Sequence, residues 1–64
     1  MNFETAKRDA NWCRYQIEML DALLRHNDAS MIRANKTRAI SAIDSTLEIL
    51  QELKCDFLSE VCNL

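Results

Sequence analysis

The chain contains neither glycine nor proline among its 64 residues. Glycine is the residue that adopts positive φ values without steric cost, and tight turns between strands usually require it. A sheet small enough for this chain would need several such turns, so the sequence argues against β structure. The commonest residues are helix formers and helix-capping types, and the length suits one domain at most. We therefore expect a single all-α domain spanning residues 1–64.

An apolar stripe runs through the first part of the chain, with steps that alternate between three and four residues. This spacing keeps its members on one face of a helix. Asn2 is suited to cap that helix, and Asp21 and Arg25 are spaced for an ion pair one turn apart. The pattern predicts a helix from about residue 3 to about residue 26. The stripe consists of Phe3, Ala6, Ala10, Cys13, Ile17, Leu20 and Leu24.

A second stripe with the same spacing predicts a helix from about residue 37 to about residue 62. Between the stripes, residues 27–36 break the apolar pattern and are rich in capping types, which favours a connector with a short helical turn. One long second helix beginning at Asp28 is the alternative, because no helix breaker occurs there. The second stripe consists of Ala39 or Ile40, Ile43, Leu47, Leu50, Leu53, Phe57, Val61 and Leu64.

With a connector, two helices of similar length can pair as an antiparallel hairpin. Small residues of one stripe then face large residues of the other, as a packed core requires. The predicted layers are Leu24 with Ile40, Leu20 with Ile43, Ile17 with Leu47, Cys13 with Leu50, and Ala6 and Ala10 with Phe57 and Leu53.

Both helices carry more apolar side chains than one seam can cover, and soluble monomers rarely leave such a surface in water. We expect a homodimer in which two hairpins form a four-helix bundle. The same surplus predicts a non-enzymatic interaction module, an adaptor or inhibitor that binds a protein partner. Its anchors are expected on the other side of the first helix, in an aromatic flank made of Trp12, Tyr15, Met19 and Leu23.

Five acidic residues repeat at every fourth position of the second helix. Each neighbouring pair costs roughly 0.2–0.5 kcal/mol of helix stability, so the row needs an explanation. One interpretation is a solvated outer face, partly neutralised by Lys7 and Arg14 across the hairpin. The other is a surface for a basic partner, including mimicry of nucleic-acid phosphates. This acidic row consists of Asp44, Glu48, Glu52, Asp56 and Glu60.

Basic residues gather around the connector, which gives an alternative function: a dimeric helical regulator that binds nucleic acid through the hairpin tip. The cluster includes no aromatic residue for base stacking, and the net charge of −2 is unlike that of a nucleic-acid binder. A structural assembly subunit is a further alternative. The basic cluster consists of Arg25, Arg33, Lys36 and Arg38.

The sequence lacks the residue patterns of catalysis. His26 is the sole histidine, and three scattered cysteines without paired spacing are expected to be buried thiols rather than a disulfide framework or a zinc site. We therefore expect no enzyme activity, no metal and no cofactor. No apolar run approaches the length of a membrane span or a secretion signal, so we expect a cytoplasmic protein without membrane contact.

Overall fold

The structure, a computed structural model, describes residues 2–62 and the side chains of residues 2–60. This part of the chain forms three helices and no strand, so the all-α prediction is confirmed. The first helix, α1, spans Phe3–Arg25, the short α2 spans Ala29–Ala34, and α3 spans Lys36–Cys62. Val61, Cys62 and Leu64, to which the sequence analysis gave places in the second stripe or among the thiols, have side chains outside the described residues.

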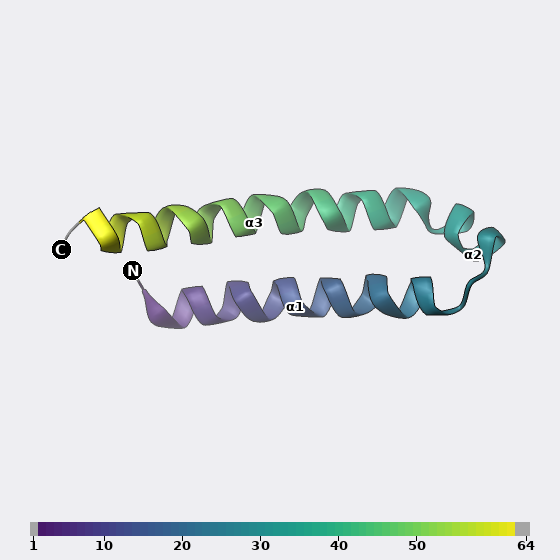
Figure 1. Ribbon diagram of the computed structural model, residues 1–64, viewed down its shortest axis with the longest axis horizontal. Coiled ribbons are helices and arrows are strands. Elements are labelled where there is room, and N and C mark those ends of the chain that lie inside the picture. The colour runs from purple at the N-terminus through teal and green to yellow at the C-terminus, as the bar shows by residue number, and fades with distance from the viewer. Residues whose placement is uncertain (1, 63–64) are drawn as a thin grey trace.

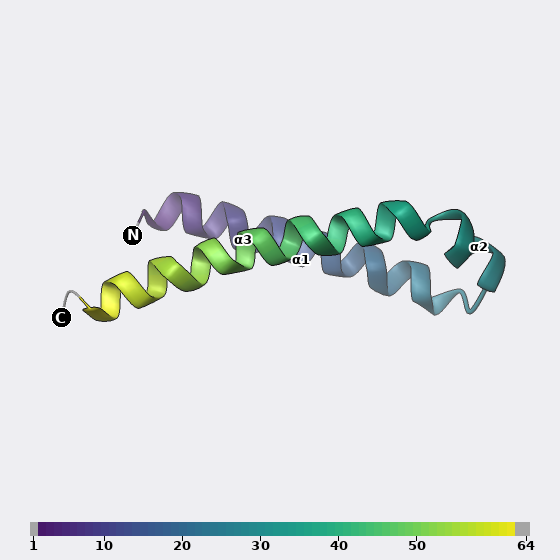
Figure 2. The ribbon, with the colours of Figure 1, turned by 90° about the horizontal axis from the view of Figure 1, so that it is seen from above.

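The two long helices lie side by side and run in opposite directions (Figure 1). The chain turns back at α2, and the first and last described residues therefore lie at the same end of the molecule. Seen from above, α1 and α3 cross at an angle (Figure 2). The molecule measures 50 × 16 × 14 Å, so it is only one pair of helices thick. A pair of helices has one shared seam, and every other face of each helix meets solvent.

Side chains cap the starts of the first two helices. The Asn2 Oδ1 atom accepts hydrogen bonds from the backbone N–H groups of Glu4 (3.0 Å) and Thr5 (3.2 Å), which confirms Asn2 as the cap of α1. Asp28 does the same for α2, where its Oδ1 accepts from the backbone N–H of Ser30 at 2.9 Å. Such caps satisfy N–H groups that have no carbonyl partner inside the helix.

A single residue separates α2 from α3. Asn35 ends α2, and both its backbone N–H and its side-chain amide donate to the Met31 carbonyl, at 3.0 and 2.9 Å. Its own carbonyl accepts from the N–H of Ala39 at 2.9 Å, which begins the hydrogen bonding of α3. The connector therefore holds the short helical segment that its capping residues predict, and the long second helix of the alternative is interrupted at Asn35.

Asn27 takes the turn between α1 and α2 with a φ of 53°, the left-handed conformation that asparagine tolerates better than most residues. We expect Asn27→Ala to lower the free energy of unfolding by about 1 kcal/mol, because alanine keeps the Cβ that crowds the carbonyl in this conformation but loses the short polar side chain that lets asparagine tolerate it. Asn27→Gly serves as the control and should cost less, since glycine has no Cβ. Urea unfolding followed by circular dichroism measures both. Equal losses would show that the backbone conformation of this turn contributes nothing to stability.

The seam between α1 and α3 is lined by the least exposed residues of both helices, which again recur at alternating steps of three and four. Its buried members are Cys13, Thr46 and Leu53, at 3%, 7% and 8% exposure. The Thr46 hydroxyl donates to the Ala42 carbonyl at 2.7 Å, so this buried polar group is satisfied. The seam consists of Ala6, Asp9, Cys13, Gln16, Leu20 and Leu23 of α1 and Ala39, Ala42, Thr46, Ile49 and Leu53 of α3.

This seam corrects the layers predicted from the sequence. Ala6, Cys13 and Leu20 do face α3 and Leu53 does face α1, but most large residues of the two predicted stripes are turned to one side and remain exposed. Small and polar residues take their places and allow the two helices to approach each other, since the distance between packed helices depends on the side chains at the contact. The predicted partners left in solvent are Phe3, Ile17, Leu24, Ile40, Ile43, Leu47, Leu50 and Phe57.

Candidate interaction surface

Large apolar side chains lie exposed along both long helices. Phe3, with 71% of its surface exposed, Leu24 with 63% and Phe57 with 61% are the extremes. We call this surface the apolar face. It consists of Phe3, Ala10, Ile17 and Leu24 of α1 and Ile40, Ile43, Leu47, Leu50, Phe57 and Leu58 of α3.

The residues of the apolar face share one side of the helix pair. At 100° per residue, the α1 members lie on the same flank of their helix, displaced from the seam by about a quarter turn on average, and the α3 members are displaced in the same sense by a similar angle. In an antiparallel pair, these two displacements point to the same side of the molecule. Phe3 and Ala10 of α1 in fact line one cavity with Leu53 and Phe57 of α3.

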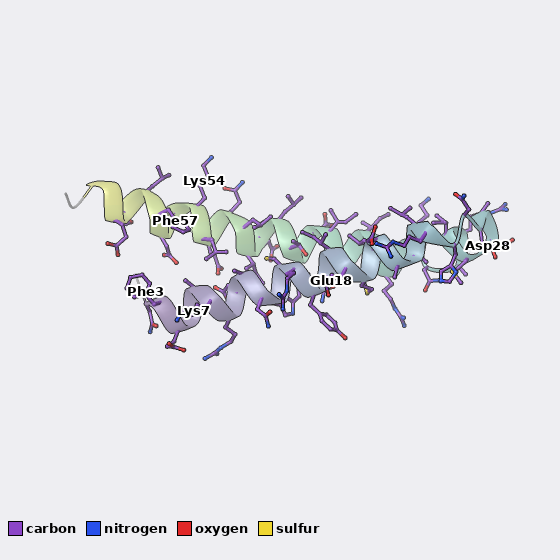
Figure 3. All side chains as sticks on the ribbon, turned by 60° about the horizontal axis from the view of Figure 1, so that its bottom comes forward. Phe3, Lys7, Glu18, Asp28, Lys54 and Phe57 are labelled. Atoms are coloured by element: carbon purple, nitrogen blue, oxygen red, sulfur yellow. The ribbon has the colours of Figure 1, made fainter. Side chains whose placement is uncertain are left out.

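That cavity lies near the end of the molecule that holds the first and last described residues. It has a volume of about 280 Å³ and is lined by apolar side chains except for Lys7. Phe3 and Phe57 lie on the two helices at this end, while Lys54 points away from α1 (Figure 3). The hollow is too open for a catalytic cleft. A small-molecule site also needs a few convergent polar groups, and the residues that line this hollow do not provide them. It is suited to receive an apolar side chain.

The predicted aromatic flank is divided by the fold. Tyr15 is 68% exposed and Trp12 is 36% exposed, whereas Met19 and Leu23 are half-buried. Met19 and Leu23 line a cavity of about 240 Å³ near the turn, together with Met31 of α2. The chain itself therefore covers half of the predicted anchors, and the flank lies on the side of α1 opposite to the apolar face.

The acidic row is exposed throughout and winds around α3. Because a step of four residues turns the helix by 400°, each acid lies about 40° further round than the one before. Glu52 and Asp56 consequently reach the side of the seam, where they line a shallow hollow with Thr5 and Asp9 of α1. No basic side chain lines this hollow.

Neither cation expected to neutralise the acidic row does so. Lys7 Nζ lies 3.8 Å from Glu4 Oε1 on the same helix. Arg14 Nη2 donates to Asn11 Oδ1 at 2.7 Å, also within α1. The predicted neutralisation across the hairpin is therefore wrong, because partners one turn away on α1 hold both cations. Asp44, Glu48, Glu52 and Asp56 are exposed to solvent.

The basic cluster lies around the turn, and its members are all exposed. Arg25 forms the predicted ion pair with Asp21, with 2.8 Å between Nη2 and Oδ2. Arg33 Nε donates to the Ala29 carbonyl at 3.3 Å. Arg38 lines the cavity that contains Met31. The cations thus share one end of the molecule but point to several environments, and they form no single groove.

Of the three predicted thiols, Cys13 is buried and Cys55 is exposed, so the expectation of buried thiols is correct for Cys13 and wrong for Cys55. Burial raises the pKa of the Cys13 thiol above its ordinary value, and the negative charge of Asp9 adds to the effect. Cys13 is thus kept in the protonated, unreactive form at neutral pH.

We expect Cys55 to react with iodoacetamide at pH 8 at least about ten times faster than Cys13, because only an exposed thiolate reacts. The comparison is made in a Cys62→Ser variant by mass spectrometry, with equal rates in urea as the control. Because folding raises the pKa of the Cys13 thiol, the protonated thiol contributes to the stability of the fold. This contribution is complete below the ordinary thiol pKa, and it is lost as the pH rises from there through the pKa of the folded state. Equal reactivity in the folded chain would contradict the burial of Cys13 in the seam.

Among the described residues, no group of three or more His, Cys, Asp or Glu side chains is placed to hold a metal ion. No helix in this part of the chain combines the length and apolarity needed to cross a membrane. Comparison with models of known families, with characterised proteins and with solved structures finds no match to this chain. The surface chemistry is therefore what a functional proposal must rest on.

The apolar pattern predicts the residues of this face, except Leu58, for the seam rather than for the surface. A signal for it does exist in the spacing. Phe3, Ala10, Ile17 and Leu24 repeat at every seventh position, and so do Ile43, Leu50 and Phe57. A strict repeat of seven is typical of residues that pack against another helix along the whole length of their own. The repeat does not indicate whether the residues pack against the other helix of the same chain or against a helix of another polypeptide.

Proposed function

We propose that the chain is a small, non-enzymatic protein–protein interaction module whose apolar face is covered by another polypeptide. The observation that supports this proposal is the set of exposed large apolar side chains along both helices, interrupted on α3 by Lys54 and on α1 by the small Ala10. The largest apolar patch of a typical soluble monomer measures about 300–600 Å², and this face exceeds it. Water contact along its length is unfavourable, so binding another polypeptide there is strongly driven.

The thinness of the fold supports the same proposal. Among the residues whose side chains are described, only Cys13, Thr46 and Leu53 are buried. Chains of this size rarely bury enough apolar surface to be stable alone and often depend on association. In the proposed complex, the hairpin of α1 and α3 adds two further helices through its apolar face and becomes half of a four-helix bundle.

Binding through the apolar face leaves the opposite side of the module free. Trp12, Tyr15 and the acidic row then remain on the outside of the complex. An adaptor or inhibitor needs such a second surface, and the charge of this one suits a partner with basic side chains. Changing Glu48, Glu52 and Asp56 together to lysine tests the acidic row, because capture of a basic partner would then be lost while the fold is retained.

Site-specific photo-crosslinking in the native cells tests the main proposal. A benzophenone amino acid placed at Leu47 lies on the apolar face, where we expect a crosslink to a polypeptide in high yield. The same amino acid at Tyr15, also exposed but outside the face, is the matched control and should give little product. Absence of a crosslink from Leu47, or equal yields at both positions, would contradict the proposal.

The nucleic-acid alternative stays a weaker proposal. Its basic cluster is partly neutralised, since Arg25 is paired with Asp21. Arg33, Lys36 and Arg38 remain for phosphate contacts, and changing them to glutamate should abolish any binding of RNA or DNA. If the unaltered chain shows no affinity for either nucleic acid at low salt, this alternative is excluded.

A further inference from the structure

We propose that the polypeptide covering the apolar face is a second copy of this chain, packed with its turn at the opposite end. This inference rests on the proposed function and names the partner for the same face. Two chains related in this way form an antiparallel four-helix bundle with a twofold axis perpendicular to the helices. The size, the spacing and the charge of the face each support it.

The area of the face matches what a stable dimer needs. Nine leucine, isoleucine and phenylalanine residues of the face are each between 42% and 71% exposed. Residues of this size at such exposure leave on the order of 100 Å² each in water, or on the order of 900 Å² per chain. Standard protein interfaces bury about 800 Å² per partner, so one copy can cover the other without a third component.

The repeats of seven give the face a centre of symmetry. On α1, the repeat from Phe3 to Leu24 has its midpoint between residues 13 and 14. On α3, the repeat from Ile43 to Phe57 has its midpoint at Leu50. Ala6 and Ala10 line a cavity with Leu53 and Phe57, so residue 13 lies level with about residue 50. One twofold axis can therefore pass through both midpoints, as an isologous interface requires.

Turning the second copy about this axis pairs apolar side chains of the two faces with each other. Phe3 then faces Leu24 of the second copy, and Ala10 faces Ile17 of the second copy. On the other helix pair, Ile43 faces Phe57 of the second copy, and Leu50 faces its own counterpart. Every one of these pairs is apolar, and the small Ala10 is matched by the larger Ile17. With the turns at the same end, Phe3 and Phe57 of both copies would instead crowd together.

The charges at the edge of the face fit the same arrangement. Lys7 comes level with the region of Asp21 in the second copy, so that opposite charges meet at both ends of the α1 pair. Arg14 lies near the axis and meets its own counterpart, but it is exposed and hydrogen-bonded to Asn11 within its helix. The acidic row begins outside the face and winds away from it. No acidic pair is therefore buried by the interface.

Sedimentation velocity of the full chain across the micromolar range tests the identity of the partner. We expect a species of twice the 7.4 kDa chain mass. A monomer that binds the dye 1-anilinonaphthalene-8-sulfonate at its apolar face would overturn self-association and leave the proposed function intact. A monomer that does not bind the dye would overturn both proposals, and a trimer or larger assembly would overturn this one.

Crosslinking single-cysteine chains tests the orientation. In a chain with Cys13→Ala, Cys55→Ser and Cys62→Ser, the variant Leu50→Cys should crosslink to itself through a short bismaleimide. Ile43→Cys should not, because its counterpart lies about 21 Å away after 14 residues of helix, but it should crosslink to Phe57→Cys in mixed samples. Circular dichroism verifies that each variant folds. Failure of Leu50→Cys, or self-crosslinking of Ile43→Cys, would overturn the proposed orientation.

Discussion

Leu50→Lys is expected to convert the proposed dimer into a monomer, with self-association weakened by at least about 100-fold, which corresponds to roughly 2.7 kcal/mol. Leu50 lies at the midpoint of the apolar face, where it faces its own counterpart in the proposed dimer. Two ammonium groups would then meet in a region removed from water. A buried charge without a partner is costly, and two like charges repel each other in addition.

The measurement is sedimentation equilibrium of the variant beside the unaltered chain. Tyr15→Lys adds the same charge at a position 68% exposed and outside the face, and should leave the dimer unchanged. Thermal unfolding provides a second measurement, because the midpoint of a dimer rises with chain concentration and that of a monomer does not. A Leu50→Lys chain that sediments as the unaltered chain does would show that pairing does not use this face.

The local features of the helices could be predicted because their causes lie within one turn of chain. Asn2 caps α1 since its side-chain oxygen reaches N–H groups two and three residues ahead. The ion pair of Asp21 with Arg25 follows from their spacing alone. The same locality explains a prediction that was wrong: Lys7 and Arg14 find partners on α1 before they can reach α3.

The rotation of the helices about their axes could not be predicted from the apolar pattern. Each long helix carries two neighbouring apolar arcs, and on α1 both arcs include Ala6, Cys13 and Leu20. Hydrophobicity favours the arc with Ile17 and Leu24 for the seam, because it buries more surface. The structure uses the arc with smaller residues, a choice that depends on how the two helices fit together. Such a fit involves residues far apart in sequence.

The division of the aromatic flank was beyond sequence reasoning for a similar reason. Met19 and Leu23 occupy the same side of α1 as Trp12, so their spacing alone predicts all three as binding anchors. The turn brings Met31 of α2 against this side, so that Leu23 and Met19 are partly covered while Tyr15 stays exposed. Where a short connector helix lies is decided by its contacts with both long helices, not by its own sequence.

Leu53→Ala is expected to lower the free energy of unfolding by about 3 kcal/mol, near the middle of the range for buried leucines. Leu53 is 8% exposed in the seam and also forms a wall of the cavity beneath Phe3. Its removal would enlarge a hollow that is already present, and the two helices cannot close it without breaking contacts on either side. A chain of this size has only a few kcal/mol of stability in all, so much of the variant should be unfolded.

Leu58→Ala removes the same atoms from a residue that is 53% exposed at the edge of the apolar face. We expect it to cost about 1 kcal/mol or less, because fewer contacts are lost and no cavity forms. Urea unfolding followed at a fixed chain concentration compares the two. Leu53→Met gives a version that keeps most of the volume and stays folded, at a cost below about 1.5 kcal/mol. Equal losses of stability for Leu53→Ala and Leu58→Ala would mean that the seam contributes no more to stability than the edge of the apolar face. That result would contradict the packing of α1 against α3 through small residues.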